Sequence, residues 1–344
     1  MDIGHFKKQL DKSLSLYLYG KIKELNSYSS DDNIKLMIEY LYDIVLSGGK
    51  RIRPYLVFLS YKSFGGTNND ILEFSSGFEL FHNFALIHDD VIDKGTKRHG
   101  ILTANEKFKK LIKHNDKIHL SNSQAILVGD LLYNRSLEVI NKKYSFDESN
   151  LLKSRQYFFK MIDEVILGQM IDVNIMGLKK VDKESIRLKN YLKTASYTFI
   201  KPLQIGAIMA GNNSNMNLLE KVGENMGLAF QIRDDLSDIV KKSSDKTQFS
   251  DIQDGQHTYI TDYIYSNGTK EQIKILNQYM GKKMTPKDIK IVQKMIDGTQ
   301  AVNHCLYMMN DLCNQATNYL EKINFTKKEY KNNYIDLINL LRRV

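Results

Sequence analysis

The stretch Ile87-His88-Asp89-Asp90-Val91-Ile92-Asp93 places three carboxylates inside an apolar helical run. A near copy, Gln231-Ile232-Arg233-Asp234-Asp235-Leu236-Ser237-Asp238, follows 145 residues later. On a helix the first and last aspartates of each cluster share a face, about 6 Å apart along the axis. Their charges repel, and the negative end of the helix dipole adds to the cost where each helix ends. Two solvated acidic turns are the simpler alternative, but apolar residues flank both clusters, so we predict that bound cations offset the charge.

The composition favours long helices over β-structure. The chain has 344 residues, of which 42% are hydrophobic, enough for a sizeable core. It holds three prolines, with none between Pro54 and Pro202, so few residues interrupt a helix. The sequence shows no strand pattern, low-complexity segment or linker. We therefore predict one all-α domain over residues 1–344.

Charge and cysteines narrow the class of protein. The formal net charge of +9 lies largely in solvated faces such as Lys107-Phe108-Lys109-Lys110, and the sequence has no arginine-aromatic stripe, so no nucleic-acid partner is predicted. No signal-peptide core or membrane-spanning run is present, which predicts a cytoplasmic protein with no integral membrane segment. His304, Cys305 and Cys313 lack a tetrahedral ligand set, so we assign them to packing rather than to zinc.

The helical pattern is long and has few interruptions. Apolar periodicity predicts helices over residues 6–25, 32–46, 55–64, 70–93, 123–139, 151–176, 183–210 and 218–240, with shorter ones nearer the end. Gly48-Gly49 and Pro54 separate the second helix from the third, and residues 94–100 form a basic loop. Lys193-Thr194 and Pro202 are expected to kink the seventh helix.

The aspartate clusters predict a particular chemistry. Clusters made only of carboxylates suit hard cations, and Mg²⁺ keeps coordination positions open for phosphate oxygens. Two such clusters could hold one diphosphate through bridging metals and make it a better leaving group. Arg98, Lys193 and Lys246 could contact the same anion, although each alone is an ordinary surface cation.

Further motifs carry a family resemblance. They are Gly48-Gly49-Lys50-Arg51-Ile52-Arg53-Pro54, His82 seven residues before Asp89, Lys193-Thr194, Gly227-Leu228-Ala229-Phe230-Gln231 and residues 246–251. With the two aspartate clusters, they resemble the trans-isoprenyl diphosphate synthase family over roughly residues 45 to 260. The resemblance implies the all-α isoprenoid synthase bundle, with both clusters at the mouth of a central cavity, and a homodimer.

The resemblance also implies roles for individual residues. The metal ligands would be Asp89, Asp90, Asp93, Asp234, Asp235 and Asp238, with Asp89, Asp93 and Asp234 as the main ligands of three Mg²⁺ ions that bridge the allylic diphosphate. The allylic diphosphate would be bound by Arg98, Lys193, Thr194, Gln231 and Lys246. Isopentenyl diphosphate would be bound by Lys50, Arg53, His82 and His99. The residues expected to be catalytic are Asp89, Asp93, Arg98, Lys193 and Asp234.

Three positions depart from the family pattern. The pair Arg98-His99 replaces two arginines, Leu102 replaces a proline, and Gln256 replaces a lysine. Histidine gives a single, pH-dependent contact where arginine gives a permanent fork. The expected activity is the Mg-dependent condensation of isopentenyl diphosphate with an allylic diphosphate (dimethylallyl, geranyl or farnesyl). A terpene synthase that cyclises or hydrolyses a prenyl diphosphate without isopentenyl diphosphate is the main alternative, and a non-catalytic partner subunit is a third.

Helix geometry gives an expectation for product length. Phe84 and Ala85 precede Asp89 by five and four residues, and helical side chains lean toward the N-terminus. They should therefore form the floor of the substrate pocket about one turn below the metals, with Phe81 a turn deeper. Ordinary core packing is the alternative role of both phenylalanines. One aromatic residue at the first of these positions resembles geranylgeranyl synthases, so this product is favoured, with farnesyl diphosphate as the close competitor.

Overall fold

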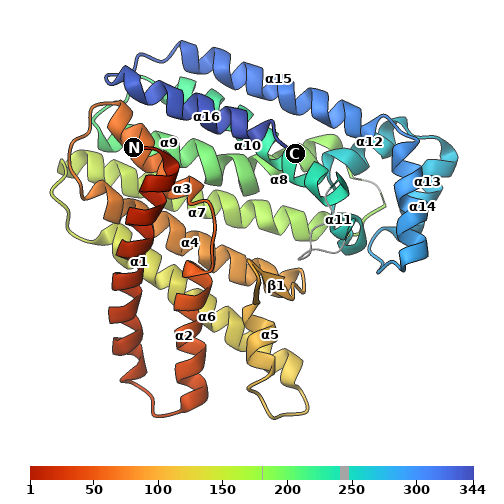
Figure 1. The fold of residues 1–344 in the computed structure, drawn as a ribbon, viewed down its shortest axis with the longest axis horizontal. Coiled ribbons are helices and arrows are strands. Elements are labelled where there is room, and N and C mark those ends of the chain that lie inside the picture. Colours follow the sequence, from red (N-terminus) through yellow and green to blue (C-terminus); the bar gives the residue numbers. More distant parts are fainter. Residues whose placement is uncertain (180, 241–247) are drawn as a thin grey trace. The chain divides into compact units, whose positions relative to one another are not determined.

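The computed structural model describes residues 1–179, 181–240 and 248–344 (Figure 1). Its contacts divide the chain into two compact units. The first unit contains Met1–Phe58 and Thr67–Asp147, and the second contains Leu59–Gly66 and Glu148–Val344. The helix α3 (Ile52–Ser63) contributes residues to both units. A single domain over residues 1–344 stays a prediction.

The first unit is mainly helical. Besides the start of α3, it contains α1 (Ile3–Asn26), α2 (Asp32–Leu46), α4 (Ile71–Ile92), β1 (Lys97–Arg98), β2 (Ile101–Leu102), α5 (Ala104–Lys109) and α6 (Lys117–Asn141). The helices α4 and α6 lie side by side (Figure 1). They approach closely at Gly77, where a Cβ atom would lie 2.8 Å from Ile140, and Ser136 Oγ donates to the Gly77 carbonyl at 2.8 Å. This close contact fixes the helix that carries the first aspartate cluster.

The second unit is also helical. It contains α7 (Glu148–Ile175), α8 (Lys183–Asn190), η1 (Tyr191–Ile200), α9 (Lys201–Met209), α10 (Met216–Val240), α11 (Ser250–Asp254), α12 (Tyr259–Asn267), α13 (Lys270–Tyr279), α14 (Pro286–Asp297), α15 (Ala301–Glu321), η2 (Lys328–Tyr330) and α16 (Lys331–Leu341). The helix α10 packs against α15 and η1, and α7 packs against η1 and α9. The aspartates of the second cluster lie near the end of α10.

The fold class predicted from the sequence is confirmed, with two local corrections. The segment predicted as a loop contains the antiparallel hairpin β1–β2, in which Lys97 pairs with Leu102 and Arg98 with Ile101. Strands of two residues are too short to show an alternating pattern, which is why the sequence did not indicate them. The expected kink at Lys193-Thr194 is a π-helix, η1, in place of a break.

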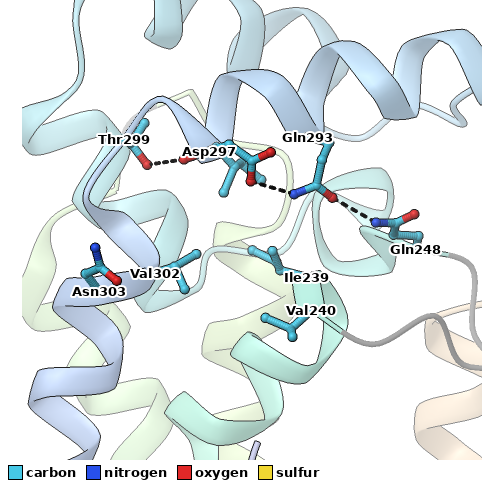
Figure 2. A pocket seen from close by; sticks show the side chains of 9 residues that line it. Ile239, Val240, Gln248, Gln293, Asp297, Thr299, Val302 and Asn303 are labelled. Atoms are coloured by element: carbon cyan, nitrogen blue, oxygen red, sulfur yellow. Dashed lines mark hydrogen bonds between the residues drawn. The ribbon is translucent and has the colours of Figure 1, made fainter.

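The second unit has a polar pocket of about 420 Å³ beside the end of α10 (Figure 2). It is lined by Ile239, Val240, Gln248, Gln293, Ile296, Asp297, Thr299, Val302 and Asn303. Gln248 Nε2 donates to Gln293 Oε1 at 2.9 Å, and Gln293 Nε2 donates to Asp297 Oδ1 at 2.8 Å. Two of the lining amides and this carboxylate thus form a hydrogen-bonded chain. All nine lining residues lie outside the site predicted from the sequence.

Membrane-spanning helices were not expected from the sequence. Among the described residues, no helix combines the length and the apolar character that crossing a bilayer requires.

Candidate active site

The first aspartate cluster lies at the end of α4. Asp89 is in the last turn, and the N–H of Asp93, which follows the helix, donates to the Asp89 carbonyl at 2.8 Å. Both residues are partly exposed, although one carboxylate oxygen of Asp93 is buried, whereas Asp90 is only 3% exposed. The cluster therefore presents its first and last aspartates on the surface and turns the middle one inward.

Arg98 holds the middle aspartate. Its Nε lies 2.9 and 3.0 Å from the two Asp90 carboxylate oxygens, and its Nη2 lies 2.7 Å from one of them. The same Nη2 is 4.0 Å from Asp89 Oδ2. Burial raises the pKa of the Asp90 carboxyl, although the Arg98 charge opposes this shift. Arg98 thus offsets charge within the cluster, and the β1–β2 hairpin brings it back to α4.

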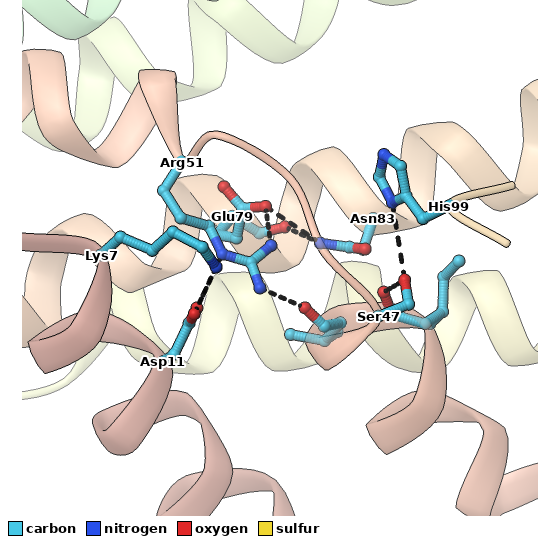
Figure 3. Close-up of polar contacts among 9 residues, drawn as sticks. Lys7, Asp11, Ser47, Arg51, Glu79, Asn83 and His99 are labelled. Carbon is cyan, nitrogen blue, oxygen red and sulfur yellow. Dashed lines mark hydrogen bonds and ion pairs between the residues drawn. The ribbon is translucent and has the colours of Figure 1, made fainter. Parts of the chain in front are cut away.

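His99 lies against the glycine loop between α2 and α3. A Cβ atom on Gly48 would be 3.6 Å from the His99 Cβ, and one on Gly49 would be 3.9 Å from His99 Cε1. Ser47 Oγ lies 3.5 Å from His99 Nδ1 (Figure 3). Partial burial lowers the pKa of His99, and the positive charge of Arg98 acts in the same direction. At neutral pH this imidazole is therefore mainly uncharged.

The other residues predicted to bind isopentenyl diphosphate lie in the same unit. Lys50 is exposed in the loop, and Arg53 is in the first turn of α3. His82 is on α4, and burial holds the pKa of its imidazole well below the ordinary value. The positive charges of Arg53 and Arg98 act on this pKa in the same direction as burial.

Two of the residues predicted to set product length, Phe81 and Phe84, belong to an aromatic cluster on α4 and α6. The Phe84 ring centroid lies 5.3 Å from that of Phe81, 5.1 Å from that of Tyr133 on α6 and 4.5 Å from that of His88. Phe81 is fully buried, whereas Phe84 and Ala85 are half-buried. Phe84 is thus held by rings on three sides, and the sequence did not indicate Tyr133 because its contact depends on how α4 and α6 pack.

The second aspartate cluster also divides into exposed and buried carboxylates. Asp234 is exposed on α10, and Asp235 is 2% exposed. Asp235 accepts hydrogen bonds from Gln231 Nε2 at 2.8 Å and from the Tyr259 N–H at 3.2 Å, and burial raises its pKa to about 6. Asp238 accepts bonds from the Ser250 N–H at 3.0 Å and the Asp251 N–H at 3.1 Å, so it caps α11.

The π-helix η1 carries Lys193 and Thr194 beside this cluster. Thr194 Oγ1 donates to Gln231 Oε1 at 2.8 Å, which joins it to the Gln231–Asp235 pair. Close approach requires glycine at the contact with α10, because a Cβ atom on Gly227 would lie 2.3 Å from the Ala195 Cα. The wider π turn sets these side chains against α10, and π-helical turns are frequent at functional sites.

Asp172 on α7 is a charged residue to which the sequence assigned no role, although it ends the stretch Gly168-Gln169-Met170-Ile171-Asp172. It is buried, with Lys193 Nζ at 2.6 Å and Lys189 Nζ at 3.2 Å. Burial alone would raise the pKa of Asp172, but the two lysines outweigh burial and lower it. Asp172 therefore stays ionised and orients Lys193. Asp172 precedes Lys189 and Lys193 by 17 and 21 residues and lies on a different helix, so no local pattern in the sequence indicated these contacts.

The predicted metal ligands lie in both units of the structure. Lys246, expected to bind the allylic diphosphate, lies outside the described residues. Within the described ranges, no group of three or more histidine, cysteine or acidic residues is arranged to hold a metal ion. The two clusters belong to different units, and Asp90, Asp235 and Asp238 bond to protein groups. The accessible carboxylates of Asp89, Asp93 and Asp234 have the hard oxygen donors that Mg²⁺ prefers.

Comparison with known proteins gives the family. An all-α fold with repeated aspartate clusters and adjoining cationic motifs defines a class of enzymes that act on prenyl diphosphates, and residues 34–299 match the polyprenyl synthetase family. The chain is 30% identical to the geranylgeranyl diphosphate synthase of Sulfolobus acidocaldarius over 273 residues, 77% of each protein. It is 26% identical to the geranylfarnesyl diphosphate synthase of Aeropyrum pernix, covering 87% of this chain and 90% of that protein. The chain belongs to the polyprenyl synthetase family and is a trans-prenyltransferase.

A solved structure supports the fold. The geranylgeranyl pyrophosphate synthase of Corynebacterium glutamicum, crystallised with isoprenyl diphosphate and magnesium, superposes with a TM-score of 0.92. The match covers 100% of this chain and 99% of that one, at 24% sequence identity. At this identity the similarity establishes the fold, and the isoprenoid synthase bundle predicted from the sequence is confirmed.

Proposed function

We propose that this enzyme condenses isopentenyl diphosphate with an allylic diphosphate to give a short-chain trans-prenyl diphosphate. The favoured product is geranylgeranyl diphosphate, and farnesyl diphosphate is the second choice. The observation that carries the proposal is the placement of Arg53 and His82 in one unit with the exposed Lys50, in addition to Arg98, which is assigned to the allylic diphosphate. An enzyme that uses only an allylic diphosphate has no evident need for the two further cations Lys50 and Arg53. The terpene synthase alternative is therefore not favoured.

The metal chemistry is assigned to the accessible aspartates. Three Mg²⁺ ions would be held by Asp89, Asp93 and Asp234. The other three carboxylates would orient the neighbouring protein groups to which they are hydrogen-bonded; these are Asp90, Asp235 and Asp238. Bound Mg²⁺ neutralises diphosphate charge and so improves the leaving group. The magnesium in the C. glutamicum synthase supports this assignment.

The chain's own residues then position the two substrates. Arg98, Lys193, Thr194, Gln231 and, outside the described residues, Lys246 would bind the allylic diphosphate. The allylic C–O bond breaks and its electron pair leaves with the diphosphate. The double bond of isopentenyl diphosphate supplies the electron pair of the new C–C bond, and a proton is lost to the departing diphosphate. Asp172 keeps Lys193 oriented for this anion, and no enzyme nucleophile is required.

We also propose a homodimer. The helix α7 exposes apolar side chains on one face, with Phe159 42%, Ile166 45%, Met170 62% and Val173 46% exposed. Their helical spacing places them on one face of α7, where in a monomer they would remain in water. Light scattering should give a mass near twice 39.8 kDa, and a mass of one chain would refute the dimer. A cytoplasmic location stays a prediction.

The decisive test of the function is a product analysis. The purified protein is incubated with Mg²⁺ and farnesyl diphosphate, with and without isopentenyl diphosphate, and products are identified by mass spectrometry. We expect a longer prenyl diphosphate only when isopentenyl diphosphate is present. A hydrocarbon or an alcohol formed without it would instead indicate the terpene synthase.

Replacing His99 by arginine should strengthen the binding of isopentenyl diphosphate. His99 lies beside Gly48 and Gly49, and its neutral imidazole offers one contact where arginine offers a charged fork. We expect the KM for isopentenyl diphosphate to fall about tenfold, the equivalent of about 1.4 kcal/mol. Steady-state kinetics with each substrate varied in turn measures this, and the KM for the allylic substrate should stay the same.

The His99→Arg variant needs a stability control. His99 has a positive φ of 49°, which arginine adopts less readily, so thermal unfolding should be recorded for both proteins. An unchanged KM in a folded variant would show that position 99 does not face isopentenyl diphosphate.

A further inference from the structure

Arg51 belongs to the Gly48–Pro54 motif but has a different environment from its neighbours. Its side chain is 1% exposed, while Lys50 beside it is exposed. Its φ of 55° lies in the left-handed region, which costs a non-glycine residue energy and persists only where the surroundings hold it. A charged side chain is thus buried at a strained position next to the predicted isopentenyl site.

The Arg51 guanidinium joins three separate elements. Nε donates to Asp11 Oδ1 on α1 at 2.8 Å, Nη1 donates to Glu79 Oε1 on α4 at 2.7 Å, and Nη2 donates to the Val45 carbonyl of α2 at 2.6 Å (Figure 3). We call Asp11, Arg51 and Glu79 the Arg51 cluster. All members lie in the first unit. Each guanidinium nitrogen therefore has an acceptor, so the arginine is fixed in position and orientation.

Further contacts bind the Arg51 cluster to the loop. Asn83 Nδ2 donates to the Glu79 carbonyl at 2.8 Å, and it lies 3.4 Å from Glu79 Oε1. A Cβ atom on Gly49 would lie 3.2 Å from Arg51 Nη1, so the loop passes directly over the guanidinium. On the outer side, Lys7 Nζ pairs with Asp11 at 2.5 Å. The backbone that carries Lys50 therefore rests on this buried group.

We propose that Arg51 is a positioning residue for isopentenyl diphosphate: it ties α1, α2 and α4 to the loop and thereby sets the placement of Lys50 and Arg53, an inference that rests on the proposed function. Arg51 does not touch the substrate, because its guanidinium is enclosed by its three acceptors. The inference brings the N-terminal helix into substrate binding through Asp11, which is 40 residues away from Arg51 in the sequence.

Three variants separate positioning from stability. Arg51→Gln removes the positive charge and the guanidinium group. Arg51→Lys keeps the charge but can make only a single contact. Asp11→Asn weakens the hydrogen bond between Arg51 and residue 11 by removing the charge of its acceptor. The matched control is Lys201→Met in the second unit, which breaks another buried ion pair, 3.2 Å between Lys201 Nζ and Glu164 Oε1. For each protein, the KM for isopentenyl diphosphate and for farnesyl diphosphate is measured together with thermal unfolding.

The expected result is a change in the KM for isopentenyl diphosphate, with little change in the KM for the allylic substrate. Arg51→Gln should raise the KM for isopentenyl diphosphate about tenfold or more and Asp11→Asn about threefold, because a displaced Lys50 or Arg53 would lose or weaken one charge-assisted hydrogen bond to that substrate. The KM for the allylic substrate should stay within about twofold. Arg51→Lys should fall between Arg51→Gln and the wild type. Lys201→Met should lower stability without changing the ratio of the two KM values.

The outcome that overturns the inference is lower stability with both KM values unchanged, as in the control. If Arg51→Gln does not fold, Asp11→Asn decides, since the Asp11 side chain is 29% exposed and tolerates the change. The wild-type reaction tests the proposed function separately. A wild type that does not use isopentenyl diphosphate refutes the function, while a normal wild type with unaltered variants refutes only the role of Arg51.

Discussion

Replacing Asp89 by asparagine is expected to lower kcat about 10³-fold, since a metal ligand that stabilises the leaving diphosphate is lost. Asp89 is a partly exposed carboxylate in the last turn of α4, and its neighbour Asp90 is already bound by Arg98. Asparagine keeps the volume of the side chain and removes only its charge. Rapid-quench or steady-state kinetics at saturating Mg²⁺ measures the loss.

The control for this variant is Asp311→Asn, an exposed aspartate on α15 that accepts a hydrogen bond from Gln315 at 2.7 Å. It should retain the wild-type kcat, and both variants should unfold at the wild-type temperature. If Asp89→Asn kept more than about a tenth of the wild-type kcat, a ligand role for Asp89 would be untenable.

Replacing Phe84 by alanine is expected to lengthen the product by one or more isoprene units. Phe84 precedes Asp89 by five residues, about 7.5 Å along the helix, on the side where the growing chain should extend. Its ring is supported by Phe81, Tyr133 and His88, so it would be a firm floor for the predicted substrate pocket. The alanine variant removes that ring and leaves Phe81 about one turn deeper. Product lengths are read by mass spectrometry.

Phe74→Leu provides the comparison for Phe84→Ala. Phe74 is fully buried on the same helix but lies 15 residues from Asp89, so its change should reduce stability without altering the product. An unchanged product distribution for Phe84→Ala would show that Phe84 is an ordinary packing residue that does not set product length.

The fold could largely be predicted from the sequence because helix periodicity and breakers are local properties. The helix predicted over residues 32–46 is α2 (Asp32–Leu46), and the first aspartate cluster ends α4 as expected. The hairpin and the π-helix could not be predicted. The hairpin strands are too short for a pattern, and η1 depends on its close contact with α10 at Gly227.

In the candidate site, too, local features could be predicted from the sequence and tertiary contacts could not. The sequence identified the carboxylates but could not tell that Asp90, Asp235 and Asp238 are held by protein groups. Gln231 lies one turn before Asp235 on α10, but the other partners come from other parts of the fold, such as the hairpin that returns Arg98 to α4. Residue type indicates which chemistry is possible, whereas tertiary contacts decide which carboxylates remain accessible to a ligand.

In the proposed function, aspartates of both clusters act on one diphosphate through shared Mg²⁺. The most direct measurement is the affinity for a non-ionising farnesyl thiodiphosphate, by calorimetry with Mg²⁺, in the wild type, Asp89→Asn, Asp234→Asn and the double variant. Each single change should weaken binding about tenfold or more, and the double variant should be little weaker than the worse single variant, because groups that act as a unit are not additive. Two losses that multiply, or binding that does not need Mg²⁺, would contradict the claim.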